Sequence, residues 1–173
     1  MEDCIPELRE LLDREAVREC IQRFARGLDR HDDELVLAAY HEDARDRHGD
    51  FVGTPREFLA WANGIHAADW VTHHHHLTTH TVEIDGDVAH AETYCIGTFL
   101  RRDGRLVDIA GGRYIDRLER RADGWRIVAR EAVIEWACAA EVGASRFSFG
   151  TSGIGTWDRS DPSYRRPLEI GIA

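Results

Sequence analysis

The sequence contains no lysine, so all 22 basic residues are arginines. A Schiff base needs a lysine amine, and so does the phosphate-binding loop of nucleotide hydrolases, so both kinds of chemistry are excluded. The chain has 32 Asp and Glu residues, a net charge of −10 and no basic stripe. This charge argues against nucleic acid and against an anionic membrane surface as partners.

Long apolar runs and paired cysteines are also missing. No segment approaches the roughly 20 apolar residues of a membrane span. The cysteines are scattered without a CxxC pair, and no signal-peptide pattern precedes them: Cys4, Cys20, Cys95 and Cys138. We therefore expect reduced thiols, no membrane association and a cytoplasmic location. At 173 residues the chain has the length of one domain, so we expect a single site.

Helical patterns occupy the first part of the chain. Apolar residues spaced three to five apart predict an amphipathic helix over residues 5–31. A second, short helix is predicted over residues 32–44. A third is predicted over residues 54–69, with Thr54 as the N-cap and Pro55 at the first helical position.

From Thr72 onward the apolar period changes to two, which indicates strands. Asp-Gly turns at 85–86, 103–104 and 123–124 predict a meander of four long antiparallel strands. Helices followed by hairpins indicate an α+β fold, with the helices covering one face of a curved sheet. We assign residues 1–140 to a catalytic domain. Residues 141–173, rich in Gly and Ser yet aromatic, form an extension expected to pack on the domain, on a partner subunit or across a cavity mouth.

The stretch THHHHLTTHTVEIDGD, residues 72–87, holds five of the ten histidines. If this strand is regular, His76 and His80 share the apolar face of Val82 and Ile84 and point inward. A single bulge would reverse the faces and give the inward position to His75. Alternate histidines could bind zinc or iron, but neither HExxH nor facial-triad spacing is present, so we expect no metal. Histidines without any role remain the alternative.

Three segments carry a family resemblance: LLDREAVRECIQRFARGLDRHDDELVLAAYHEDA, THHHHLTTHTVEIDGDVA and GGRYIDRLERRADGWRIVAREAVIEW. Over residues 7–137 the chain resembles the SnoaL-like branch of the nuclear transport factor 2 superfamily. The resemblance implies a cone of curved antiparallel sheet wrapped around helices, with a deep cavity, in a homodimer or homotrimer. Characterised members of the superfamily include scytalone dehydratase, hexachlorocyclohexane dehydrochlorinase, bile-acid dehydratase, polyketide cyclases and a diarylpropane lyase.

The resemblance also implies site residues. The family aspartate at the end of the first helix matches Asp29, the histidine of the first long strand matches His76, and the arginine after the last-strand tryptophan matches Arg130. A strand aromatic matches Tyr114. Phe24 departs from the pattern, because relatives often have Tyr or Lys there.

Elementary chemistry supports a pair of Asp29 and His76. Asp29 borders the buried stripe of its helix, so its carboxylate can accept a hydrogen bond from one imidazole nitrogen. Such a pair is a general base worth about 10²–10⁴ in rate. A solvated Asp29 is the alternative.

Arg130 would stabilise developing negative charge, unless it points outward and pairs with an acid. Six further residues are candidates for substrate binding. We expect them to donate a hydroxyl hydrogen bond, to pack in the core, to form a small apolar cavity wall or to supply a second carboxylate: Tyr40, Tyr114, Phe24, His80, Cys95 and Asp108.

These residues predict a cofactor-independent lyase that acts on a small apolar, aromatic molecule. Elimination and retro-aldol cleavage both fit, including formaldehyde release from a lignin-derived diarylpropane, which would place the protein in aromatic compound catabolism. An isomerase or polyketide cyclase could use the same base. A non-catalytic ligand-binding or assembly subunit, like the small subunit of ring-hydroxylating dioxygenases, is the alternative from another class. Separation of the aspartate and histidine beyond hydrogen-bond distance would favour it.

Overall fold

The computed structural model describes residues 6–143 and 155–170. Helix α1, Pro6–Arg30, is continuous and buries a stripe that includes Val17, Ile21, Phe24 and Leu28. These positions recur every three or four residues, as a helix packed along one face requires. The predicted amphipathic helix is therefore confirmed.

Helix α3, Pro55–Asp69, also begins where the sequence predicts. The Thr54 side chain accepts a hydrogen bond from the backbone N–H of Glu57, and the Glu57 carboxylate accepts one from the backbone N–H of Thr54. This capping box satisfies two N–H groups that lack partners within the helix. None of the helices in the described ranges is long and apolar enough to cross a membrane.

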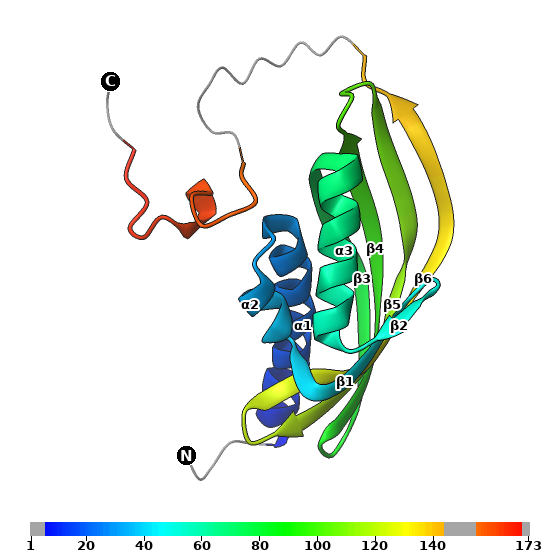
Figure 1. The fold of residues 1–173 in the computed structure, drawn as a ribbon. Helices are drawn as coiled ribbons and strands as arrows, with labels where there is room; N and C mark the ends of the chain where they lie inside the picture. Colours follow the sequence, from blue (N-terminus) through cyan, green and yellow to red (C-terminus); the bar gives the residue numbers. More distant parts are fainter. Residues whose placement is uncertain (1–5, 144–154, 171–173) are drawn as a thin grey trace.

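One curved six-stranded sheet forms the other layer (Figure 1). Its order is β2-β1-β6-β5-β4-β3. The four long strands pair as an antiparallel meander, and Gly86, Gly104 and Gly124 adopt positive φ at its turns, so the predicted meander and the α+β class are confirmed. The strands are β1 Tyr40–His48, β2 Phe51–Gly53, β3 Trp70–Asp85, β4 Val88–Arg101, β5 Leu106–Arg121 and β6 Gly124–Glu141.

The helix predicted over residues 32–44 is wrong in its second half. Helix α2 is only Asp33–Leu37, and the chain then enters β1 at Tyr40. Strand β1 lies parallel to β6, which makes the sheet mixed rather than wholly antiparallel. Pairing with a strand some 85 residues later in the chain overrides the local helical pattern.

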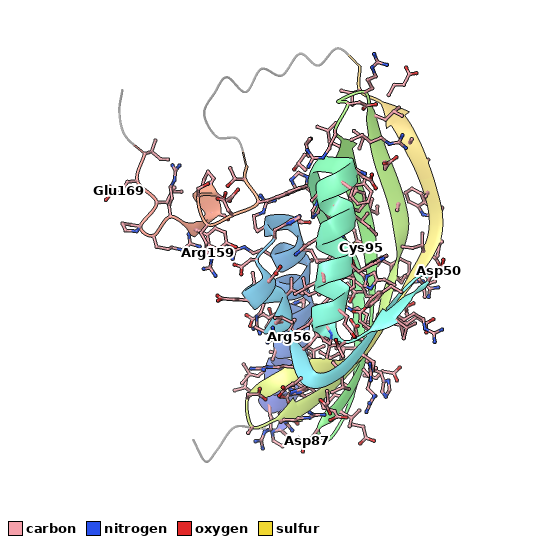
Figure 2. All side chains as sticks on the ribbon, viewed as in Figure 1. Asp50, Arg56, Asp87, Cys95, Arg159 and Glu169 are labelled. Atoms are coloured by element: carbon pink, nitrogen blue, oxygen red, sulfur yellow. The ribbon has the colours of Figure 1, made fainter. Side chains whose placement is uncertain are left out.

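The helices lie against the concave side of the sheet, and side chains fill the space between the layers (Figures 1 and 2). The core forms where α1 and α3 meet the inner faces of the strands. The upper parts of β3–β6 extend beyond this core, and there the inner face borders a cavity.

The described part of the C-terminal segment, residues 155–170, contacts the C-terminal end of α1. The guanidinium of Arg30 lies 3.1 Å from the carboxylate of Asp161, and the hydroxyl of Tyr164 donates to Asp32 over 2.5 Å. Residues 144–154 and 171–173 of the predicted extension lie outside the described residues. The boundary at residue 140 stays a prediction.

Candidate active site

A β-bulge in β3 decides which histidines face the cavity. Leu77 pairs with Cys95 of β4 and His80 pairs with Thr93, so β3 contains one more residue than β4 in this interval. The extra residue reverses the alternation of faces. His75 therefore points inward and His76 is exposed, and the inward placement predicted for His76 is wrong.

The imidazole of His75 is paired with Asp29. Its Nδ1 donates to Asp29 Oδ1 over 2.7 Å, and its backbone N–H donates to Oδ2 over 3.0 Å. The side chains of His75 and Asp29 are 9% and 14% exposed. Burial raises the pKa of Asp29, but the hydrogen bonds and charge of His75 outweigh this effect and lower the pKa, so the carboxylate stays ionised. This leaves Nε2 of His75 as the nitrogen that can accept a proton.

His75 lies on the wall of a cavity of about 1040 Å³ between α3 and the inner face of the sheet. The lining is largely apolar and includes Trp61, Trp70, Phe99 and Tyr114. A cavity of this size accommodates an aromatic molecule of one or two rings. Asp29 lies behind His75 and borders a neighbouring groove instead.

Three of the predicted substrate-binding residues line this cavity: Tyr114, Cys95 and Asp108. Burial raises the pKa of Tyr114 well above its usual value, so its hydroxyl stays protonated. Burial raises the pKa of the Cys95 thiol to about 11, which fits a small wall residue better than a nucleophile. Asp108 is bound by the guanidinium of Arg101 and by Trp70 Nε1, which donates over 3.0 Å.

Arg130 does not line this cavity. Its Nε and Nη2 donate to the two carboxylate oxygens of Asp116 over 2.7 and 2.8 Å, and both side chains are fully buried. The guanidinium carbon lies 4.0 Å from the ring centre of Phe24 and 4.3 Å from that of Tyr114. Burial lowers the pKa of Arg130, but the charge of Asp116 outweighs it and the pKa is raised, so the ion pair persists. Its Nη1 has no hydrogen-bond partner among the described residues.

The remaining predicted residues lie in the core or in a separate small pocket. Phe24 and Tyr40 are buried with their ring centroids 5.7 Å apart, behind the cavity wall. His80 points inward as predicted, and its Nδ1 lies 2.8 Å from Thr93 Oγ1. It borders a pocket of about 50 Å³ beside α1, not the large cavity.

Two residues of β1, Asp46 and His48, lie beside the cavity although no sequence pattern predicts them as site residues. Nδ1 of His48 lies 2.5 Å from Asp46 Oδ1, and the His48 ring lines the same cavity as His75. The helix predicted over residues 32–44 overlaps the start of β1, so the alternation of Ala44, Asp46 and His48 toward one face was not recognised as part of a strand. The Gly49-Asp50 turn between two short strands was the available signal.

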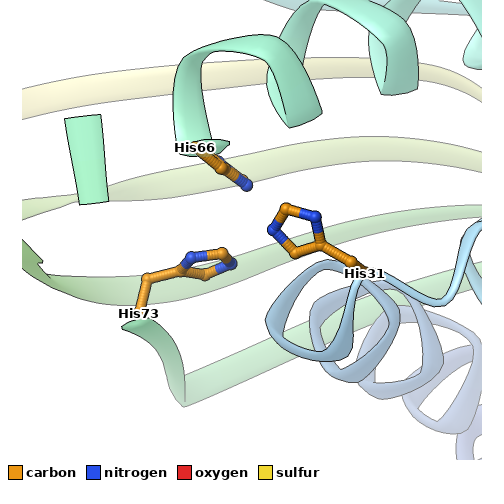
Figure 3. A group of neighbouring side chains, drawn as sticks. All are labelled: His31, His66 and His73. Carbon is orange, nitrogen blue, oxygen red and sulfur yellow. The ribbon is translucent and has the colours of Figure 1, made fainter. Parts of the chain in front are cut away.

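A cluster of three histidines lies beside the site (Figure 3): His31, His66 and His73. One ring nitrogen of each lies within 4.8 Å of the others, a spacing from which three imidazoles could face one cation. However, His73 Nε2 lies 3.0 Å from the Leu28 carbonyl and must donate to it, which leaves Nδ1 with the lone pair. Burial lowers the pKa of His66 to about 2 and of His73 to about 4, so both are neutral. The expectation that the protein needs no metal stays a prediction.

Comparison with solved structures supports the fold. LinA aligns with a TM-score of 0.72 and 17% identity, over 83% of this chain and 99% of LinA. A protein of Novosphingobium aromaticivorans named after scytalone dehydratase aligns with a TM-score of 0.68 and 18% identity, over 79% and 93% of the two chains. A hexachlorocyclohexane dehydrochlorinase of Novosphingobium barchaimii aligns with a TM-score of 0.64 and 19% identity, over 79% of this chain and 97% of that protein.

No curated protein sequence matches the chain. The family model of the SnoaL-like domain matches residues 9–131, which include Asp29, His75 and Arg130. The match spans α1 and most of the sheet, so it covers both the helix and the strand that form the aspartate–histidine pair. The chain therefore belongs to the SnoaL-like domain family.

Proposed function

We propose that this protein is a cofactor-independent lyase in which His75, held by Asp29, removes a proton from a small aromatic molecule. One observation carries the proposal. The 2.7 Å hydrogen bond from His75 Nδ1 to Asp29 fixes the imidazole on the cavity wall with Nε2 as the acceptor. The carboxylate also stabilises the imidazolium that forms when Nε2 takes the proton.

Two reactions fit this base. In an elimination, Nε2 takes a proton from carbon, the C–H electron pair forms a C=C bond, and the leaving group departs with its bonding pair. In a retro-aldol-type cleavage, Nε2 takes the proton of a hydroxyl, and the O–H electron pair forms the C=O bond of the released carbonyl compound. The C–C bonding pair forms a C=C bond as a leaving group departs from the next carbon. Release of formaldehyde from a lignin-derived diarylpropane is of the second kind. The missing lysine means that neither route passes through a Schiff base.

The lining supports an apolar aromatic substrate, because indole and phenyl rings cover much of the cavity wall. The named relatives support elimination, since their names refer to dehydration and dehydrochlorination. Tyr114 remains protonated and can donate a hydrogen bond to an oxygen that gains negative charge. We propose aromatic compound catabolism as the physiological setting of this chemistry.

A matched pair of variants tests the proposal, because β3 offers two adjacent histidines on opposite faces. His75→Gln should lower kcat by about 10²–10⁴, and His76→Gln should leave it within about twofold. Suitable probes are 3-hydroxy-1-phenylpropan-1-one, which can lose water, and a diarylpropane-1,3-diol, which can lose formaldehyde together with water. Mass spectrometry of the products distinguishes the two losses. Equal activity of the two variants on both probes would exclude His75 as the base.

The same experiment separates the competing functions. An isomerase or polyketide cyclase changes the probe without changing its mass. A non-catalytic ligand-binding or assembly subunit binds the probe in calorimetry and returns it unaltered. The hydrogen bond between Asp29 and His75 supports the enzymatic function over the latter, because an accidental pair has no reason to lie on the cavity wall.

We also propose a homodimer or homotrimer formed through the outer face of the sheet. Four large apolar side chains on β4–β6 are exposed there: Tyr94, Ile96, Ile115 and Trp136. Contiguous apolar surface on a sheet is typical of subunit interfaces. Light scattering on the purified protein gives the number of subunits.

A further inference from the structure

The β1–β2 hairpin brings a second histidine–carboxylate pair to the cavity. His48 Nδ1 lies 2.5 Å from Asp46 Oδ1, and the Tyr40 hydroxyl donates to the other carboxylate oxygen. The Asp46 side chain is fully buried, whereas that of His48 is 16% exposed. His48 and His75 both line the 1040 Å³ cavity. The family match spans Asp46 and His48, but the sequence analysis does not predict them as site residues.

The hydrogen bonds determine which atom of His48 faces a ligand. Burial raises the pKa of Tyr40 well above its usual value, so its hydroxyl donates and keeps its proton. Asp46 accepts from Tyr40 on one oxygen and from His48 Nδ1 on the other. Nε2 of His48 forms no hydrogen bond within the described ranges of the chain, so it is the nitrogen left for a molecule in the cavity.

The two pairs approach the cavity from different sides. Strands β1 and β3 are separated in the sheet by β6, β5 and β4. The His48 ring stacks on Phe58 of α3 at 4.5 Å and lies 5.9 Å from the ring centroid of Tyr114. His75 approaches from β3, with its ring 5.7 Å from that of Phe99. The cavity wall therefore carries two imidazoles on different strands, each backed by a carboxylate.

We propose that His48, held by Asp46 and Tyr40, is the general acid that protonates the leaving group while His75 acts as the base. This inference rests on the proposed function. It also narrows the substrate class, because a hydroxyl or ether leaves only when it gains a proton, whereas a halide departs without one. The preferred substrates are therefore alcohols or ethers rather than halides.

The proton balance of the step is closed. His75 Nε2 takes the proton from carbon, and the C–H electron pair forms the C=C bond. The C–O bond breaks, and its oxygen takes the proton from His48 Nε2 and leaves as water or an alcohol. The imidazolium of His75 and the neutral His48 then exchange one proton through water, which restores both to their starting states.

Two probes that give the same product test the acid. Loss of water from 3-hydroxy-1-phenylpropan-1-one and loss of HCl from 3-chloro-1-phenylpropan-1-one both yield phenyl vinyl ketone, which is followed by its absorbance. His48→Gln should lower kcat on the alcohol by about 10²-fold or more and on the chloride by less than about threefold. His48→Phe should do the same and retains the stacking on Phe58, so it checks that packing is not the cause.

The outcomes separate this inference from the proposed function. His75→Gln should lower kcat on both probes, and no effect on either would refute the base and with it the proposed function. If His48→Gln and His48→Phe lowered kcat equally on both probes, His48 would support packing or binding. Its proposed role as the general acid would then be refuted. If the unaltered protein turned over the chloride but not the alcohol, the proposed role of His48 as the acid would also be refuted. The proposed role of His75 as the base would stand.

Discussion

Two ionic pairs of this protein differ in their access to the cavity. This difference indicates which pair stabilises the fold and which pair can take part in a reaction. Arg130 and Asp116 face each other on neighbouring strands β6 and β5, and both side chains are fully buried. Asp29 and His75 link α1 to β3, and the imidazole forms part of the cavity wall. A sealed pair cannot exchange a proton with a substrate, whereas a pair on the wall can. We expect substitutions in the first to change folding and substitutions in the second to change turnover.

The largest expected effect is that of Asp29→Asn on turnover. The asparagine oxygen can still accept the backbone N–H of His75, but the neutral side chain no longer stabilises the imidazolium. We expect kcat to fall by about 10²–10⁴, with little change in the free energy of unfolding. Steady-state kinetics and urea denaturation of the same preparation measure both quantities.

Asp33→Asn is the control for this variant, since Asp33 lies four residues away and contacts Asn63 outside the cavity. It should change kcat by less than about twofold. If Asp29→Asn destabilised the fold strongly while kcat of the folded fraction stayed normal, the two pairs would be alike and the comparison would fail.

Breaking the buried pair of Arg130 and Asp116 has the next largest expected effect, which is on the free energy of unfolding. Arg130→Met leaves the carboxylate of Asp116 buried and without its ion-pair partner, which costs about 3–5 kcal/mol in the free energy of unfolding. The double variant Arg130→Met, Asp116→Leu removes both charges and should regain most of that loss. Urea denaturation measures the difference.

Turnover of the same variants tests the role that the sequence predicts for Arg130. Its Nη1 is buried and lacks a hydrogen-bond partner among the described residues, and Arg130 does not line the cavity. If the double variant is stable but inactive, Arg130 acts on the substrate and the predicted role in charge stabilisation is correct. If the double variant is stable and active, the ion pair serves the fold alone.

The meander and the helices α1 and α3 were predicted correctly, because they rest on local signals such as Asp-Gly turns, apolar periodicity and the Thr54 capping box. The position of Asp29 beside the buried stripe could also be read from the helical period. The inward placement of His75 in place of His76 could not be read from the sequence, since it depends on a bulge that nothing in THHHHLTTH marks.

Asp46 and His48 were missed for a different reason. Strand β1 exists because it pairs in parallel with β6, a contact between distant parts of the chain that a local pattern does not contain. The same holds for Arg130, whose partner Asp116 is set by the register of β5 against β6. The residues that one element presents are therefore predictable from the sequence, whereas a side chain whose surroundings are determined by two strands together is not.

His66 and His73, the neutral histidines beside His75, make the stability of the fold depend on pH. His66 and His73 are buried, and burial is the main cause that lowers the pKa of His66 to about 2 and that of His73 to about 4. In the unfolded chain both take up protons below a pH of about 6.5. Between pH 6.5 and 4 the unfolded state therefore binds more protons than the folded state, and the folded state loses stability as the pH falls.

We expect the free energy of unfolding to drop by about 1.4 kcal/mol per pH unit for each of these two histidines between about pH 6 and pH 5, and the contribution of His73 to fade as the pH approaches 4. His31 and His80, whose pKa values are also lowered by burial, add to the decline. Urea denaturation between pH 7 and 4.5 measures the slope, and His66→Phe should reduce it by about 1.4 kcal/mol per pH unit. If the slope were unchanged in this variant, His66 would take up a proton in the folded state. Buried imidazoles near the cavity would then be as accessible to protons as His75 on the cavity wall.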